Sequence, residues 1–184
     1  MKKIKFFAAI ITYLLLALAD GGLTYYNTPD LSMEGNPLVA ELGLGWGALA
    51  IANILTFVGF TLILYYYFFK YETVYTDETK LTRYWSQVVY GRPDKFWTGL
   101  IPKRFGPFVA MLAFATIPAF IISRAIVVAE WICYTLDVDQ SKYWAFERKF
   151  LFGNIHITVA TVITIIAIIV FMYKEFKKQL PKVN

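Results

Sequence analysis

The chain of 184 residues is poor in the residues that build metal and redox sites, since it has one cysteine and one histidine. The single cysteine, Cys133, excludes an intramolecular disulfide and any metal site made of several cysteines. The single histidine, His156, excludes haem ligation by two histidines of one chain. The sequence also lacks an HExxH or comparable metal motif. It therefore names no cofactor.

Charge is scarce as well, because only 17% of the residues are charged whereas 58% are hydrophobic and 18% aromatic. This composition is too apolar for an ordinary soluble domain. A net charge of +5 would suit nucleic acid, but the basic residues flank apolar runs. We therefore expect the lipid bilayer as the partner, and no nucleic acid. No Ser/Gly-rich linker divides the chain, so we predict one membrane domain over residues 1–184.

Four apolar runs occupy about residues 6–26, 37–69, 108–134 and 150–173. Each is near or above the roughly 20 residues that a membrane-spanning helix needs. Backbone polar groups must be satisfied inside the bilayer, which favours helices. We predict an all-α integral membrane bundle of four transmembrane helices, with an interfacial connection over 70–107. The start resembles a signal peptide, but Asp20 and Thr24 continue the helical spacing past its cleavage point, so we expect a retained helix.

Basic residues set the expected orientation. All but four of the 18 lysines and arginines lie before the first run, in the 70–107 connection or after the fourth run. The exceptions are Arg124, Lys142, Arg148 and Lys149. Both termini and the connection are thus predicted to be cytoplasmic, in a multi-pass protein of the plasma or inner membrane.

The second run is too long for one straight crossing, because it would reach about 50 Å as a helix. Gly43, Gly45 and Gly47 lie near its start. We expect a short interfacial piece around 37–44, then a bend or tilt before the true span. Alternatively, the glycines form a flat face for close helix packing. Pro118 predicts a kink in the third helix.

The 70–107 connection combines aromatic with basic residues. Its aromatic residues include Trp85, Tyr90, Phe96 and Trp97. One interpretation is a surface-lying segment held by aromatic anchors and anionic lipid. The other is a docking platform for a partner protein. We favour the first, because such residues are typical of membrane interfaces.

Polar residues recur in the outer half of every predicted helix. Tyr13, Asp20, Thr24 and Asn27 share one face of the first helix. That face should point into the bundle, because a lipid-facing carboxylate costs about 2.5–3.5 kcal/mol on insertion scales. The other outer polar residues are Glu34, Asn36, Glu41, Ser123, Arg124, Glu130, Asn154, His156, Thr158 and Thr161. Asn53 and Thr56 are exceptions near mid-span.

Structural roles account for many of these residues. Asn36-Pro37 is typical of a helix start, with Asn as the N-cap and Pro in the first turn. Asp20 and Arg124 suit a buried ion pair that fixes helix register. His156 suits a hydrogen bond to Asp20 or Glu34. The functional alternative is a pocket, because ionisable residues within membranes are candidates for function.

A functional pocket admits three chemistries. Asp20, Glu34, Glu41 or Glu130, with His156, suit a divalent cation with mixed oxygen and nitrogen ligands. Alternatively, His156 acts as a general base while Arg124 holds the phosphate or oxyanion of a lipid headgroup. A proton relay or a Na⁺ site is the third. The candidate nucleophiles Ser32, Ser123 and Cys133 stand in no recognisable setting.

The spacing Asp20-x3-Thr24, followed by Glu34-x-Asn36-Pro37 and then Gly45, resembles a family of small polytopic bacterial and archaeal membrane proteins catalogued as a domain of unknown function. The resemblance covers residues 11–60. It implies the fold and marks these residues as the motif, but it supplies no activity. The family often carries a basic residue in the second helix, where this chain has Asn53 or Thr56. We therefore expect Arg124 to supply the cation for Asp20.

Two hypotheses follow for function. The first is a non-catalytic subunit or scaffold of a membrane complex, with other subunits or further copies of the chain as partners. The second is a membrane-embedded enzyme or binding protein that acts on a metal ion or a lipid headgroup from the outer side. The polar cluster common to both is Asp20, Thr24, Glu34, Asn36, Arg124, Glu130 and His156. We favour the first hypothesis, because capping, register pairing and interfacial belts account for most of the features.

Overall fold

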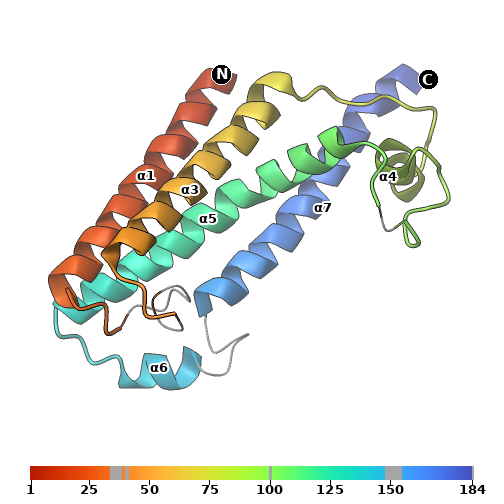
Figure 1. Ribbon diagram of the computed structural model, residues 1–184. Coiled ribbons are helices and arrows are strands. Elements are labelled where there is room, and N and C mark those ends of the chain that lie inside the picture. The colour runs from red at the N-terminus through yellow and green to blue at the C-terminus, as the bar shows by residue number, and fades with distance from the viewer. Residues whose placement is uncertain (34–38, 40–41, 100, 148–154, 184) are drawn as a thin grey trace.

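The computed structural model describes residues 1–33, 39, 42–99, 101–147 and 155–183 (Figure 1). Over these residues the chain is helical and contains no strand, which confirms the all-α prediction. The elements are α1 (Lys2–Asn27), α3 (Trp46–Tyr65), the π-helical turn η1 (Tyr66–Lys70), α4 (Leu81–Tyr90), α5 (Phe105–Thr135), α6 (Ser141–Glu147) and α7 (Ile155–Val183).

Four helices are long and apolar enough to cross a membrane, as expected. They are α1, α3 with η1, α5, and the Ile155–Leu180 part of α7. This arrangement fits a multi-pass membrane protein. Both termini lie at one end of the bundle, called here the terminal end, and α6 lies at the opposite, loop end (Figure 1). That the terminal end is cytoplasmic stays a prediction.

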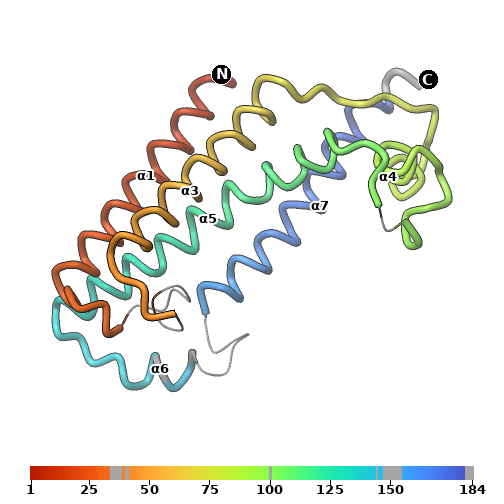
Figure 2. Tube along the Cα trace, in the orientation of Figure 1, coloured from red at the N-terminus to blue at the C-terminus, as the bar shows by residue number. Residues whose placement is uncertain are grey.

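The bundle is organised around α5. The helices α1 and α3 lie on one side of it and α7 on the other (Figure 2), and α5 packs most extensively against α7 and α1. Between α1 and α3, a core forms from Phe6, Ala9 and Tyr13 with Phe60 and Leu64. Burial of such apolar and aromatic surface fixes how these two helices sit together.

The second apolar run breaks before its span, as predicted. Gly43 has a left-handed φ of +64°, which glycine adopts readily, and Gly45 is the N-cap of α3. Close packing of these glycines is not seen among the described residues, since a Cβ at Gly43, Gly45 or Gly47 would meet none of them within 4 Å.

The fourth helix is longer than expected, since α7 continues from residue 173 to Val183. The lysines that follow residue 173 mark the end of the apolar run, but they alternate with buried residues. Glu175, Phe176 and Gln179 are buried, so the last turns of α7 form an amphipathic helix. Hydropathy alone placed the helix end too early for this reason.

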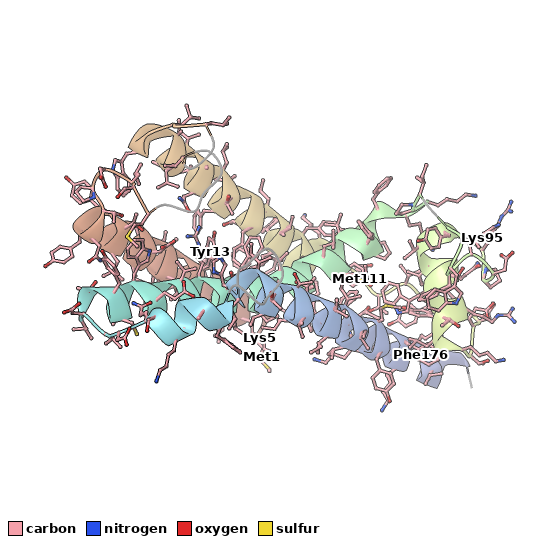
Figure 3. All side chains as sticks on the ribbon, turned by 90° about the horizontal axis from the view of Figure 1, so that it is seen from below. Met1, Lys5, Tyr13, Lys95, Met111 and Phe176 are labelled. Atoms are coloured by element: carbon pink, nitrogen blue, oxygen red, sulfur yellow. The ribbon has the colours of Figure 1, made fainter. Side chains whose placement is uncertain are left out.

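The 70–107 connection is also more folded than expected. Residues 71–99 and 101–104, called here the α4 lobe, lie beside the terminal end of α7 (Figure 1). Tyr84, Trp85 and Val88 form a second core with Phe171 and Phe176 of α7. Figure 3 labels Phe176 where α7 meets α4, and Lys95 at the far side of the lobe.

The aromatic residues of the lobe therefore divide into two groups. Trp85 is only 2% exposed and donates its indole N–H to the Met172 carbonyl oxygen at 2.9 Å, so its interpretation as a membrane anchor is wrong. Tyr90 and Phe96 pack partly against the same core. Trp97 is 86% exposed, so both the membrane-interface interpretation and the docking interpretation stay open for it.

Candidate functional site

Asp20 and Arg124 meet inside the bundle, as the sequence predicted. Arg124 Nη1 donates to Asp20 Oδ2, and its Nη2 donates to Asn53 Oδ1 at 2.6 Å. The Asn53 amide is oriented by its own bond, from Nδ2 to the Leu49 carbonyl at 2.9 Å. Three helices, α1, α5 and α3, thus contribute one polar side chain each.

The polar face of α1 points inward along its length. Tyr13 and Thr24 are each 1% exposed and Asp20 is 9% exposed. The Thr24 hydroxyl donates to the backbone carbonyl oxygen of Asp20 at 2.9 Å. A threonine in an apolar helix commonly satisfies its hydroxyl proton in this way. Asn27 donates to Thr135 Oγ1 of α5 at 2.9 Å. This face ties α1 to α5 near the loop end.

His156 lies at the start of α7 and faces the same region. Its ring is within electrostatic range of the Asp20 carboxylate. Arg124 and His156 both line a cleft of about 520 Å³ that runs along α5. The structure therefore brings Asp20, Arg124 and His156 together, from α1, α5 and α7.

Glu130 lies apart from this cluster. Its carboxylate accepts a hydrogen bond from the Tyr143 hydroxyl, and its carbonyl accepts one from Gln140 Nε2 at 3.4 Å. Both partners belong to the segment around α6. Glu130 thus holds this segment to α5. The sequence pattern groups Glu130 with Asp20 and Arg124, but the structure places it in a separate set of contacts.

Several predicted positions lie outside the described residues. These are Glu34, Asn36, Pro37, Glu41 and Asn154. Over the ranges that the structure does describe, no group of three His, Cys, Asp or Glu side chains is arranged to hold a metal ion. Of the predicted cation ligands within the described ranges, Asp20 and His156 share one region and Glu130 lies apart, whereas Glu34 and Glu41 lie outside those ranges.

The three candidate nucleophiles occupy different places. Ser32 lies in an exposed turn and donates its hydroxyl to Asp30 Oδ1 at 2.9 Å. The Ser32 backbone N–H, and to a smaller extent this hydroxyl, hold the pKa of Asp30 below its ordinary value. Cys133 is half-buried in α5, and Ser123 lines the cleft beside Arg124. Of the three, Ser123 alone lies in the same cleft as His156.

A second polar group, at the terminal end, escaped the sequence prediction. Glu175 accepts hydrogen bonds from the Tyr71 hydroxyl at 3.0 Å and from Lys178. The side-chain carbonyl of Gln179 accepts from both the backbone N–H and the hydroxyl of Thr76, at 3.2 and 3.1 Å. The i, i+4 spacing of Glu175 and Gln179 was the available signal, but the neighbouring lysines made this segment look solvated.

Burial and the nearby Glu175 carboxylate raise the pKa of the Tyr71 hydroxyl well above its ordinary value. The same two causes, in the same order, raise the pKa of Tyr84. Both hydroxyls therefore remain neutral donors. Tyr84 uses its proton to reach the Val74 carbonyl at 2.9 Å, so the two tyrosines tie the 71–80 segment to α7 and α4.

No protein-family model, curated protein or solved structure matches the chain. The resemblance of residues 11–60 to a family of unknown function therefore stays a prediction from the motif alone.

Proposed function

We propose that this chain is a non-catalytic subunit or scaffold of a membrane complex. Support comes from how the ionised groups of the described spans are used. Asp20 is bound by Arg124, Glu130 by Tyr143, and Glu175 by Tyr71 and Lys178. Each of these groups holds one part of the chain to another, as structural ion pairs do.

The observation that carries the proposal is the α4 lobe. The chain builds it on α7 with a dedicated core and keeps Trp97 outside that core, 86% exposed, with Ile101 78% exposed. Lys95 and Lys103 flank these two residues in the sequence, and residues 95–99 and 101–103 are called here the tip of the lobe. Exposed tryptophan with basic neighbours is typical of binding surfaces. The lobe presents this tip to a partner subunit at the cytoplasmic face.

Site-specific photocrosslinking tests the proposal. A photoreactive amino acid replaces Trp97 in the full chain, and the cells are irradiated before lysis. We expect one discrete protein adduct, identified by mass spectrometry. The control position is Arg83, which is also exposed, pairs with Glu78 and belongs to α4, outside residues 95–103 of the sequence, and it should give no such adduct.

Two results of this experiment would contradict the proposal. Adducts to lipid alone at position 97 would overturn the partner role and support the membrane-anchor interpretation of the tip. Identical protein adducts at both positions would indicate unspecific contact and would also contradict the proposal.

A further inference from the structure

A lateral cleft lies between α7 and the α1–α3 pair, with α5 as its floor. Its volume is about 520 Å³, which is in the range of small-molecule sites. Its polar lining consists of Tyr13, Thr56, Ser123, Arg124, His156, Thr161 and Thr164, and Ala160 and Ile165 belong to its apolar lining. Because its walls belong to helices that are long and apolar enough to span a membrane, we expect its occupant to come from the lipid phase.

Aromatic rings join the helices on the terminal side of the cleft. Tyr13 packs against Phe60 and Phe120, with ring centroids 4.8 and 6.0 Å apart, which joins α1 to α3 and α5. Further along, the Tyr67 ring lies 6.1 Å from that of Phe171 and so joins η1 to α7. Because η1 and α7 are in contact there, a partner helix could not lie between α3 and α7 along their whole length, which favours a shorter occupant.

The polar part of the cleft is deep. Arg124 lies eleven residues before Thr135, the last residue of α5, or about 16 Å along the helix. A phospholipid headgroup is charged and hydrated, and moving it to this depth would cost as much as burying other ions. The depth favours a small head that tolerates an apolar medium.

The charge balance points to an uncharged head. The Asp20 carboxylate binds Arg124 directly, so an anion beside this guanidinium would be repelled by Asp20. Two of the five guanidinium N–H groups are used by Asp20 and Asn53. A guanidinium paired in this way still suits a neutral carbonyl oxygen.

The threonines add acceptors. Thr56, Thr161 and Thr164 each donate their hydroxyl proton to a backbone carbonyl of their own helix at 2.8 Å. Their oxygens therefore offer lone pairs toward the cleft, which suits a hydroxyl on a ligand. The combination recognises a head with hydrogen-bonding oxygens and no net charge.

We propose that this cleft binds a neutral amphiphile whose small head carries carbonyl or hydroxyl oxygens. The head lies among Arg124, Ser123 and Thr164, and the apolar tail leaves between α3 and α7 into the bilayer. Isoprenoid quinones and prenols share this chemistry with neutral acylglycerols. The inference is independent of the subunit role, because a scaffold and a ligand-binding protein can both carry such a site.

Lipid analysis of the full chain tests the site. The protein is extracted with its native lipids in polymer nanodiscs, and the lipids are compared by mass spectrometry with those of the whole membrane. We expect one neutral, small-headed lipid to be enriched about tenfold or more, corresponding to about 1.4 kcal/mol of preference. Ala160→Trp should abolish the enrichment because the indole fills the cleft.

Val162→Trp is the matched control. It places the same ring two residues along α7, where the side chain is 49% exposed and outside the cleft lining, so the enrichment should persist. Thr164→Val keeps the shape and removes one oxygen, and should weaken the enrichment severalfold because the head bonds there. Wild-type chain in phosphatidylcholine nanodiscs doped with ubiquinone or with diacylglycerol then separates the two sources by thermal shift.

Three results would overturn the proposal. The first is a lipid profile equal to that of the bulk membrane. The second is enrichment of a lipid with a charged headgroup. The third is equal loss of enrichment in Ala160→Trp and Val162→Trp, which would indicate damage to α7 and no specific site. Since none of these measurements involves Trp97 or a protein partner, failure here is distinct from failure of the subunit proposal.

Discussion

At the scale of the residue, the Asp20 carboxylate lies within an apolar helix and is stabilised there by polar groups of the other helices. An isolated ionised group in an apolar medium is strongly disfavoured. Asp20 receives a guanidinium from α5, and that guanidinium is further held by the Asn53 amide of α3. Protein groups thus replace the hydration that the bilayer removes.

This arrangement predicts strong coupling between Asp20 and Arg124. Asp20→Asn or Arg124→Gln alone should lower the free energy of unfolding by about 3–5 kcal/mol, because each leaves one buried charge without its partner. The double substitution should cost clearly less than the sum of the two. The measurement is unfolding in mixed micelles followed by circular dichroism.

The control for this cycle is Asp30→Asn. Asp30 is exposed and lies in the turn after α1, so its substitution should change stability by no more than about 0.5 kcal/mol. Strictly additive losses for Asp20 and Arg124 would show that the pair does not act as a unit.

At the scale of the element, α7 has two different halves. Toward the loop end it lines the cleft with His156, Ala160 and Thr164. Toward the terminal end it buries Glu175 and Gln179 against the α4 lobe. One rigid helix therefore connects the cleft with the lobe.

The tyrosines of the lobe predict a loss of stability in alkali. An unfolded tyrosine ionises near its ordinary pKa of 10.0, whereas burial and Glu175 raise the pKa of Tyr71 in the folded chain. The stability from this difference is complete below about pH 10 and declines as the pH rises further. Tyrosinate absorbance during an alkaline titration should show a delayed group of tyrosines.

Tyr71→Phe should remove part of the delayed absorbance, because it removes one of the protected hydroxyls. Tyr84→Phe should remove another part of the delayed absorbance, because burial and Glu175 raise the pKa of Tyr84 as well. If neither variant reduces the delayed absorbance, the two hydroxyls are not protected by burial and by Glu175.

At the scale of the whole molecule, both termini and the α4 lobe lie at one end of a four-span bundle (Figure 1). Most of the basic residues belong to this end, including those of the lobe and of the last turns of α7. Because basic segments tend to stay on the cytoplasmic side of a membrane, this end of the bundle is predicted to face the cytoplasm.

Cysteine labelling checks this orientation. In a Cys133→Ala background, a single cysteine replaces Lys5, Lys177, Asp30 or Asp139. A membrane-impermeant maleimide should label positions 30 and 139 in intact cells, and positions 5 and 177 only after permeabilisation. Labelling of position 5 or 177 in intact cells would contradict the predicted orientation.

Much of the architecture could be predicted, because long apolar runs can exist in a bilayer only as helices. The inward face of α1 followed from its helical spacing, and Arg124 was the one ionised base within a span that could answer Asp20. The lobe could not be predicted in the same way. Trp85 looks the same in sequence whether it anchors in lipid or packs on α7, and only its neighbours in space decide.

Four spans, a break after the piece around 37–44 and a partner for Asp20 could all be inferred from residues alone, since they follow from local hydropathy, glycine conformation and the cost of buried charge. The tertiary structure alone decided that Asn53 joins the pair, that Glu130 serves α6 instead, and that α7 leaves an open cleft beside α5. Such outcomes depend on how far helices lie from each other and at what angle, which arises from packing over the whole bundle and is encoded in no single stretch of residues.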